Sequence, residues 1–259
     1  MTMDFIITPG KKIIFCIILS IIIVIFSFGF LLGNKYGEVI PVLNKRLVPI
    51  YQVARDDKLL SITLDGTWGA DYTDNILEIL RENDVKITFF FAGYWLEKYP
   101  EMVKKIASEG HEIENHSYTH PHFNQLSNQE IEKEINSTTE LIENLIGKRP
   151  RFFRPPFGEY NNNVIEKITE MGYQVIQWSI DSHDWKEPGV DHIVKQILNA
   201  DSGDIILMHN NAPETPEALK TVLPLLEEKG YKIVPLSELV FKDNYFIESH
   251  SGKQVRGGN

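Results

Sequence analysis

The sequence predicts an α/β fold of parallel strands and covering helices, preceded by one N-terminal transmembrane helix. From residue 59 to residue 240, short apolar runs alternate with amphipathic runs of helical spacing, which gives about seven βα units. Repeated βα units imply a parallel sheet with helices on its outer face. A closed barrel and a doubly wound open sheet both agree with this pattern. No G-x-G-x-x-G follows the first predicted strand, which argues against a dinucleotide-binding fold.

The transmembrane helix is predicted from residues 13–33, which contain no charged residue and are rich in Ile, Leu, Val and Phe. A helix of about 21 residues spans roughly 32 Å, close to the ~30 Å hydrocarbon core of a bilayer. Lys11 and Lys12 precede it and predict that the N-terminus stays inside the cell. A cleavable signal peptide is the alternative, although its apolar region is usually only about 7–15 residues long. We expect an uncleaved single-pass anchor in the cell membrane and an extracytoplasmic catalytic domain.

The predicted elements follow in chain order after a tether of mixed polarity. Apolar runs bounded by turn residues predict strands at residues 59–65, 87–92, 111–115, 152–154, 174–180, 204–208 and 232–235. Apolar spacings of three and four residues predict helices at residues 72–82, 100–109, 127–145, 162–171, 192–199 and 215–228. The chain therefore divides into an anchor (1–34), a tether (35–57), a barrel or sheet domain (58–241) and a polar C-terminal tail (242–259) that we expect to be frayed.

Composition and charge restrict the partners. The chain has 259 residues, of which 42% are hydrophobic and 24% charged, as in one globular domain with appendages. Its net charge is −10 and it has no basic cluster outside the N-terminus, so nucleic acid is not an expected partner. The single cysteine, Cys16, lies in the apolar segment and excludes a disulfide within the chain. We expect a monomer.

Ionisable or rigid residues follow five of the predicted strands. The active sites of parallel α/β barrels lie at the C-terminal ends of their strands. Each residue alone could be a solvated loop charge, but five such strand ends together predict a single cleft. In chain order these residues are Asp65, His116 with His120, the turn Arg154-Pro155-Pro156-Phe157-Gly158, Asp181 with Asp184 and Trp185, and His209.

His116 and His120 predict a metal site, because neutral imidazoles that converge on one point hold Zn²⁺, Co²⁺ or a similar divalent ion. The H-x-x-x-H spacing is a weak signal alone, and the other strand ends support it. Such a metal would activate a water molecule and polarise a carbonyl. Asp65 is then the expected general base, and His209 the expected acid that protonates a leaving nitrogen.

Other residues are expected to support this chemistry. Arg154 would orient Asp65 through a charge-assisted pair, and Asp181 would hold the imidazole of His209 in its cationic form. The two prolines would stiffen their loop so that the backbone N–H of Phe157 stabilises an oxyanion. Flat aromatic faces that suit sugar rings, although each could belong to the core, are those of Trp68, Tyr160 and Trp185.

Five segments together resemble the motifs of the polysaccharide deacetylase family, carbohydrate esterase family 4 with a nodulation-type deacetylase domain. The resemblance covers about residues 59–240. The anchor and the Val48-Pro49-Ile50-Tyr51 segment also resemble the sporulation-associated branch of this family. The five segments are Thr63-Leu64-Asp65, His116-Ser117-Tyr118-Thr119-His120, Arg154-Pro155-Pro156-Phe157-Gly158, Asp181-Ser182-His183-Asp184-Trp185 and Leu207-Met208-His209.

The resemblance implies a distorted (β/α)7 barrel that holds a divalent metal, with zinc expected first and cobalt, nickel or manganese as alternatives. It implies a hydrolase of carbon–nitrogen bonds other than peptide bonds, which removes N-acetyl groups from peptidoglycan or chitin-like glycan. Removal of O-acetyl groups from xylan is an alternative. By resemblance, Asp65 is the base, His209 the acid, and His116 and His120 are metal ligands. Phe157, Tyr160 and Trp185 are the expected substrate contacts.

One position departs from the family pattern. The first motif of the family usually reads T-F-D-D-G, and its second aspartate completes the metal site, whereas this chain has Gly66 there. Asp71 could replace that ligand from the following loop, or Asp65 or water could fill the position. The departure leaves two function classes open. One is a metal-dependent deacetylase, and the other is a catalytically silent barrel that binds glycan or protein during wall or spore assembly.

Overall fold

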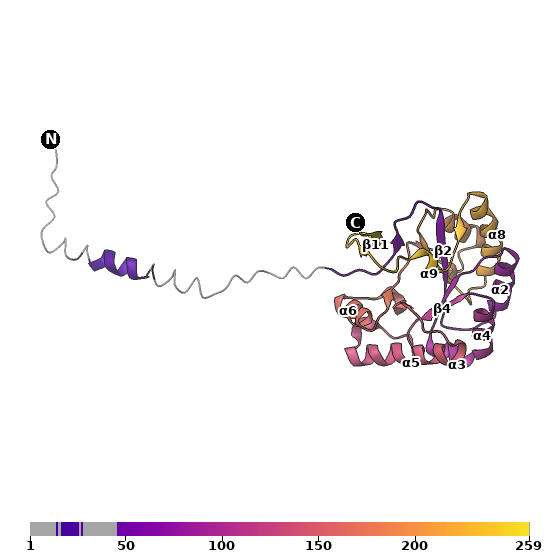
Figure 1. Cartoon of the computed structure of the whole chain (residues 1–259), viewed down its shortest axis with the longest axis horizontal. Helices are drawn as coiled ribbons and strands as arrows, with labels where there is room; N and C mark the ends of the chain where they lie inside the picture. The colour runs from indigo at the N-terminus through magenta and orange to yellow at the C-terminus, as the bar shows by residue number, and fades with distance from the viewer. Residues whose placement is uncertain (1–13, 15–16, 26, 28–45, 259) are drawn as a thin grey trace, which may run out of the picture. The chain divides into compact units, whose positions relative to one another are not determined.

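A computed structural model of the chain describes residue 14, residues 17–25, residue 27 and residues 46–258 (Figure 1). The chain divides into two units, Met1–Lys45 and Arg46–Asn259. The described residues of the first unit are helical. Within the described residues, the structure contains no helix long and apolar enough to cross a bilayer. The remainder of the predicted anchor and residues 35–45 of the predicted tether lie outside the described residues.

The second unit is built on parallel strands. The longest strand, β2 (Leu59–Gly66), pairs with β3 on one side and β8 on the other, and β9 pairs with it separately. The sheet runs in the order β6-β5-β4-β3-β2-β8-β7. Its other strands are β3 (Thr88–Phe91), β4 (Glu112–Asn115), β5 (Phe152–Phe153), β6 (Gln174–Val175), β7 (Ile180–Asp181), β8 (Ile205–His209) and β9 (Lys232–Ile233).

The sheet curls into a barrel because its two edge strands, β6 and β7, belong to one stretch of chain. Only residues 176–179 separate them, although they lie at opposite ends of the sheet order. The sequence predicts one continuous strand over 174–180, and the structure divides it. The stretch changes partner within this range, from β5 at Val175 to β8 at Ile180. The α/β class is confirmed, and the parallel strands agree with the predicted (β/α)7 barrel.

Alternation along β2 separates two layers of packing. Leu60, Ile62 and Leu64 belong to the large apolar cluster that also contains residues of helices α2 (Thr73–Glu82) and α8 (Thr215–Glu228). Between them, Ser61, Thr63 and Asp65 are buried polar residues. Successive side chains of a strand point to opposite faces, so the polar set points into the barrel. Asp65 therefore reaches the cleft from the last inward-facing position of the strand.

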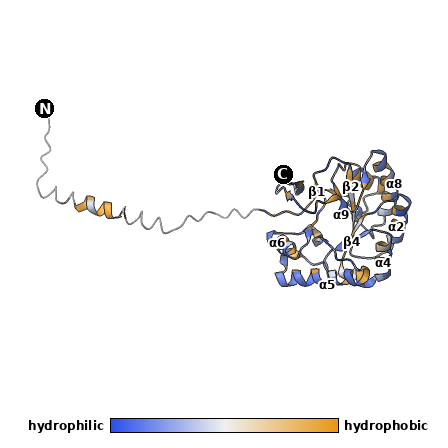
Figure 2. Ribbon diagram, viewed as in Figure 1, coloured by the Kyte–Doolittle hydropathy of each residue, from blue (hydrophilic) through white to orange (hydrophobic). Residues whose placement is uncertain are grey.

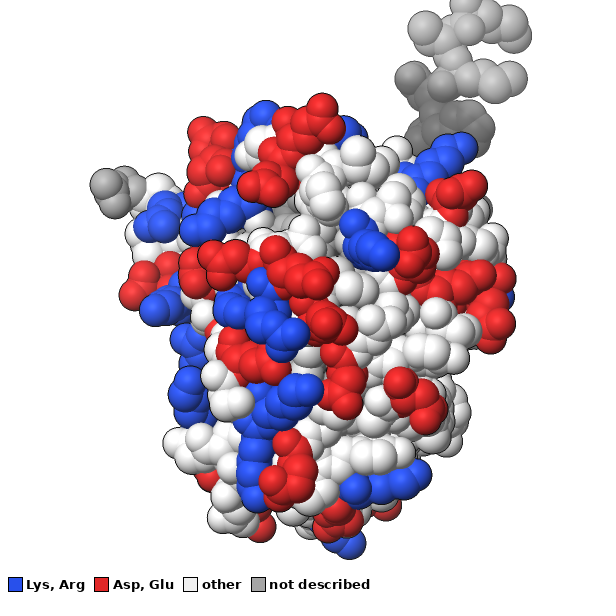
Figure 3. Space-filling view, turned by 90° about the vertical axis from the view of Figure 1, so that its right-hand side faces the viewer, with Lys and Arg blue, Asp and Glu red and all other residues white. Residues whose placement is uncertain are grey.

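Helices cover the outside of the barrel (Figure 1). Each turns an apolar face inward, as Ile76, Leu77 and Leu80 of α2 show. In Figure 2 the ribbon of α5 is largely hydrophilic along the outer edge of the domain. The helices are α2 (Thr73–Glu82), α3 (Gly93–Lys98), α4 (Pro100–Ser108), α5 (Asn128–Ile146), α6 (Asn162–Glu170), α7 (Val190–Ile197), α8 (Thr215–Glu228) and α9 (Leu236–Leu239). On the face drawn in Figure 3, basic side chains are interspersed with acidic ones, as on a solvated surface.

The two ends of the unit form a small second sheet, β1-β11-β10. Strand β1 (Gln52–Val53) pairs in parallel with β11 (Lys253–Arg256), which forms a hairpin with β10 (Tyr245–Ile247). Gln254 is fully buried, and its side chain bonds both the N–H and the carbonyl of Phe241 at 2.8 and 2.9 Å. The expectation of a frayed tail is therefore wrong for the described residues up to 258. The polar composition of this segment did not indicate a strand, because β11 pairs with β1, which is distant in sequence.

Candidate active site

A cleft of about 650 Å³ opens where the barrel strands end. Most of the residues predicted for the site line it. Arg154 lies beneath it, with no exposed surface. The predicted residues that line the cleft are Asp65, Trp68, His116, His120, Phe157, Asp181, Trp185 and His209.

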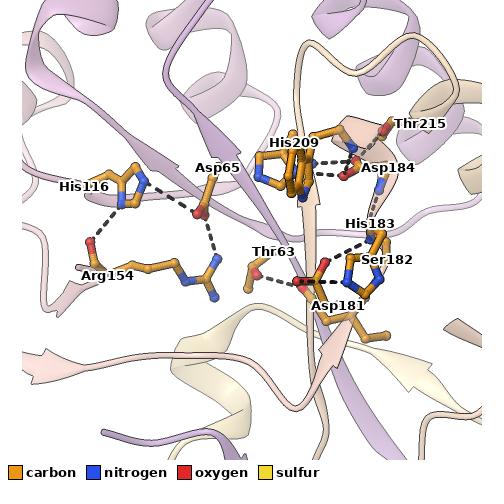
Figure 4. Close-up of polar contacts among 12 residues, drawn as sticks. Thr63, Asp65, His116, Arg154, Asp181, Ser182, His183, Asp184, His209 and Thr215 are labelled. Atoms are coloured by element: carbon orange, nitrogen blue, oxygen red, sulfur yellow. Dashed lines mark hydrogen bonds and ion pairs between the residues drawn. The ribbon is translucent and has the colours of Figure 1, made fainter. Parts of the chain in front are cut away.

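Asp65 and Arg154 form a buried ion pair at the floor of the cleft (Figure 4). Arg154 Nη1 donates to Asp65 Oδ1 at 2.6 Å, and Nη2 donates to the backbone oxygen of Gln177 at 3.2 Å. Burial favours the neutral form of Asp65, but the charges of Arg154, His116 and His209 outweigh it and lower the pKa of this carboxyl. Asp65 is therefore ionised, as a proton acceptor must be. The predicted role of Arg154 as its orienting partner agrees with this geometry.

His116 is held in the state that a metal ligand requires. Its Nδ1 donates to the backbone oxygen of Arg154 at 2.8 Å, which leaves a lone pair on Nε2. That nitrogen lies 3.6 Å from Asp65 Oδ2, and burial lowers the pKa of the ring. The ring of His120 lies 4.9 Å from that of His116, and burial, together with the repulsion that two protonated rings would have, lowers its pKa to about 3. Two neutral imidazoles beside a carboxylate fit a divalent cation.

The loop that carries both histidines is anchored to helix α5 by one carboxylate. Glu134 accepts hydrogen bonds from the N–H groups of Tyr118 and Thr119 at 2.8 and 2.7 Å, and from the Thr119 hydroxyl at 2.8 Å. Ser117 and His120 have φ values of 66° and 58°, in the left-handed region that non-glycine residues seldom adopt. Glu134 therefore stabilises a strained loop from a helix that lies outside the histidine motif.

A third protein ligand for a metal is missing from the described part of the chain. Within the described residues, no three His, Cys, Asp or Glu side chains are grouped to hold an ion. Catalytic zinc sites usually have three protein ligands, so the two imidazoles fit a metal but the set is incomplete.

The predicted substitute ligand, Asp71, does not complete the set. It does not line the cleft, and its backbone N–H bonds Asn211 Oδ1 at 2.7 Å. Within the described residues, the structure does not group Asp71 with the two histidines, which corrects the sequence prediction.

Position 66 itself points away from the cleft. A Cβ atom placed on Gly66 would lie 2.2 Å from ring carbons of Phe91. Phe91 is fully buried and stacks on Trp95 with ring centroids 3.9 Å apart. Gly66 follows the outward-facing residues of β2, so a carboxylate here would enter the apolar layer under the helices.

His209 is bonded to Asp184 and not to Asp181, which corrects the sequence prediction (Figure 4). Asp184 Oδ1 lies 2.7 Å from His209 Nδ1, and Oδ2 accepts the backbone N–H of His209 at 2.7 Å. Asp181 Oδ1 instead accepts the N–H of His183 at 2.9 Å. Burial lowers the pKa of His209, but the hydrogen bond and charge of Asp184, with smaller effects of Asp65 and Asp181, raise it overall. Asp181 therefore acts on His209 only through its charge.

Two of the three predicted substrate contacts line the cleft, and the third does not. Phe157 and Trp185 line the cleft and are 55% and 57% exposed. Phe157 has φ 58°, and its ring packs 4.5 Å from that of His120. Tyr160 is not among the cleft-lining residues, and its hydroxyl bonds that of Tyr51 at 3.0 Å, so the prediction that it binds substrate is wrong.

Comparisons with known proteins show the family to which this chain belongs. The family model described as polysaccharide deacetylase matches residues 52–176. The chain is 37% identical over 208 residues to a peptidoglycan-N-acetylglucosamine deacetylase of Bacillus cereus, with 76% of this chain and 97% of that protein covered. It is 35% identical over 193 residues to the uncharacterized protein YlxY of Bacillus subtilis, with 74% of this chain covered and only 60% of that protein's length.

This chain is also similar to a solved structure. The pseudoenzyme BA3943 of Bacillus anthracis, from carbohydrate esterase family 4, superimposes with a TM-score of 0.71 at 36% identity, over 74% of this chain and 68% of that one. A mutant of BA3943 has restored enzymatic activity.

Proposed function

This chain belongs to the polysaccharide deacetylase family, and we propose that it removes N-acetyl groups from N-acetylglucosamine of cell-wall glycan in a metal-dependent reaction. The predicted class, a polysaccharide N-deacetylase that hydrolyses carbon–nitrogen bonds, is confirmed by the family and the names of relatives. Enzymes of this class depend on a metal in general, and the choice of sugar follows the names of the Bacillus cereus relatives.

One observation supports this proposal most. Asp65 and His209 line one cleft with pKa values shifted in opposite directions, lowered for the carboxyl and raised for the imidazole. Such a pair supplies an ionised base and a protonated acid at the same pH. A binding module has no need of it.

These residues divide the work of amide hydrolysis. Asp65, held by Arg154, accepts the proton of the attacking water. His209 Nδ1 is bonded to Asp184, so Nε2 remains to protonate the departing amine as the acetyl carbon–nitrogen bond breaks. In this proposal the backbone N–H of Phe157 stabilises the oxyanion. A divalent ion at His116 and His120 would polarise the acetyl carbonyl.

The assignment of His209 can be tested with the full-length chain and N-acetylglucosamine oligomers. His209→Ala should lower the rate of acetate release by about 10²–10⁴-fold, because it removes the general acid. His250→Ala is the matched control, since that imidazole is 81% exposed on the C-terminal hairpin. Wild-type turnover in His209→Ala would refute the assignment.

A catalytically silent glycan-binding barrel is the second candidate. Gly66, the incomplete ligand set in the described residues and the likeness to a pseudoenzyme favour it. The two candidates differ in one result: a silent barrel binds the oligomers but releases no acetate with any divalent metal.

We further propose that the chain is a monomer, anchored in the cell membrane by its N-terminal helix, with the barrel outside and a role in sporulation. The apolar run at residues 13–33 supports the anchor. The chain should stay with membranes after an alkaline carbonate wash, and external protease should reach the barrel. A free mature protein that begins near residue 30 would show cleavage instead.

A further inference from the structure

We infer that Trp68 is a sugar-binding platform on the histidine side of the cleft, so that the cleft takes an internal sugar of a glycan with neighbours on both sides. The inference rests on the proposed function for its ligand class. It goes further in predicting the length of glycan that the cleft recognises.

Trp68 lines the cleft and is 67% exposed. Exposure of an indole ring to water is costly, and large aromatic side chains at the rim of a cleft commonly contact a ligand. Its ring meets the ring of His120 edge to face, with centroids 5.5 Å apart. Trp68 therefore lies beside the predicted metal ligands and leaves most of its surface free.

The loop that carries Trp68 is fixed from two sides. The carbonyl of Gly69 accepts hydrogen bonds from Trp95 Nε1 at 2.6 Å and from Asn210 Nδ2 at 3.2 Å. Asn211 Oδ1 accepts the N–H of Asp71 at 2.7 Å. Gly69 has φ 67°, and a Cβ there would lie 2.2 Å from Asn211. These contacts hold Trp68 in place before a ligand arrives, which lowers the entropy cost of binding.

A second exposed indole borders the other side of the reacting groups. Trp185 lines the cleft and directly follows Asp184, the partner of His209. In Figure 4, Asp65 lies between His116 and His209. The sugar that carries the acetyl group must lie at Asp65 and His209. Its two neighbours along the glycan then lie against Trp68 and Trp185, so three consecutive sugars are recognised.

The test measures affinity for N-acetylglucosamine and its dimer, trimer and tetramer by titration calorimetry of the full-length chain, with acetate followed in parallel. Trp68→Ala should weaken binding of the trimer and tetramer by about 10-fold, the effect of losing a central aromatic contact. Binding of the monomer should change by less than about 2-fold, and Trp68→Phe should recover most of the lost affinity. Phe246→Ala, which removes a 52% exposed ring from the hairpin, should match wild type at every length.

The outcomes distinguish failure of the Trp68 platform from failure of the proposed function. Equal trimer affinity in wild type and Trp68→Ala would overturn the platform and leave the proposed function standing. An equal loss for monomer and tetramer would also overturn it, because a distorted fold has no length dependence. Failure of the wild-type chain to bind any oligomer would overturn the proposed function itself.

Discussion

The bond between His209 and Asp184 decides the alkaline limit of activity. Asp184 is fully buried and also accepts the hydroxyl of Thr215 at 2.5 Å, so its carboxylate is held in place. Asp184→Asn removes the charge that most raises the pKa of His209. His209 must be protonated to act, so the alkaline limb of the rate profile should move to lower pH by about one unit. Rates of acetate release across pH measure this shift.

Asp181→Asn is the matched control for this prediction. Asp181 lies within range of His209 but makes its hydrogen bond to His183. Its substitution should move the same limb by a smaller amount. A larger shift in Asp181→Asn than in Asp184→Asn would restore the role that the sequence suggested for Asp181.

Gly66→Asp, which restores the usual family residue, should not restore the usual site. The new Cβ would collide with the Phe91 ring, and the carboxylate would be buried in an apolar layer. Overpacking and burial of a charge should lower the free energy of unfolding by about 3 kcal/mol. Gly258→Asp is the control, because a Cβ at Gly258 meets nothing within 4 Å. Chemical denaturation measures both, and a stable Gly66→Asp variant with tighter metal binding would contradict this account.

Residue types at strand ends were sufficient to predict most of the site. Asp65, His116, His120, Phe157, Asp181, Trp185 and His209 line one cleft as expected. The sequence did not distinguish Asp181 from Asp184 as the hydrogen-bond partner of His209. The two residues are three positions apart in one turn, and either carboxylate could face the imidazole. Asp71 and Tyr160 are not among the residues that line the cleft, and the hydroxyl of Tyr160 is bonded to that of Tyr51 instead.

Helix α5 acts on the cleft through Glu134. Its carboxylate bonds three groups of the loop between His116 and His120. Glu134→Ala should release this strained loop and weaken divalent metal affinity by about 10-fold, the usual cost of losing a support for metal ligands. Glu140→Ala removes the same charge from the same helix at an exposed position and should leave the affinity unchanged. Calorimetric titration with zinc compares the two, and equal affinities would mean that the loop holds itself.

Sequence periodicity identified the helices and strands that have a signal within their own residues. Helix α5 begins one residue later than predicted, and its Ser127–Glu130 capping box marks that start in the sequence. Strands β6 and β7 were predicted as one, and β1, β10 and β11 were missed. Strand β1 has only two residues, and its partner β11 lies at the other end of the unit, so no window of sequence contains the pair.

The barrel as a whole depends on the segment that leads into it. Ile50 donates its N–H to Val175 and accepts that of Gln177, at 2.9 and 2.8 Å, at the point where β6 gives way to β7. Gln177 in turn accepts a hydrogen bond from Arg154. Ile50, which the sequence assigned to a tether, is thus part of the wall that positions the Asp65–Arg154 pair.

Deacetylation of glycan in this cleft requires a metal held by an incomplete ligand set. The test is acetate release from N-acetylglucosamine oligomers by the full-length chain, measured before chelation, after chelation and after zinc is restored. We expect chelation to abolish the release and zinc to restore it, because the two imidazoles are neutral and free to bind an ion. Release that persists in chelator, or oligomer binding without release under any metal, would contradict it.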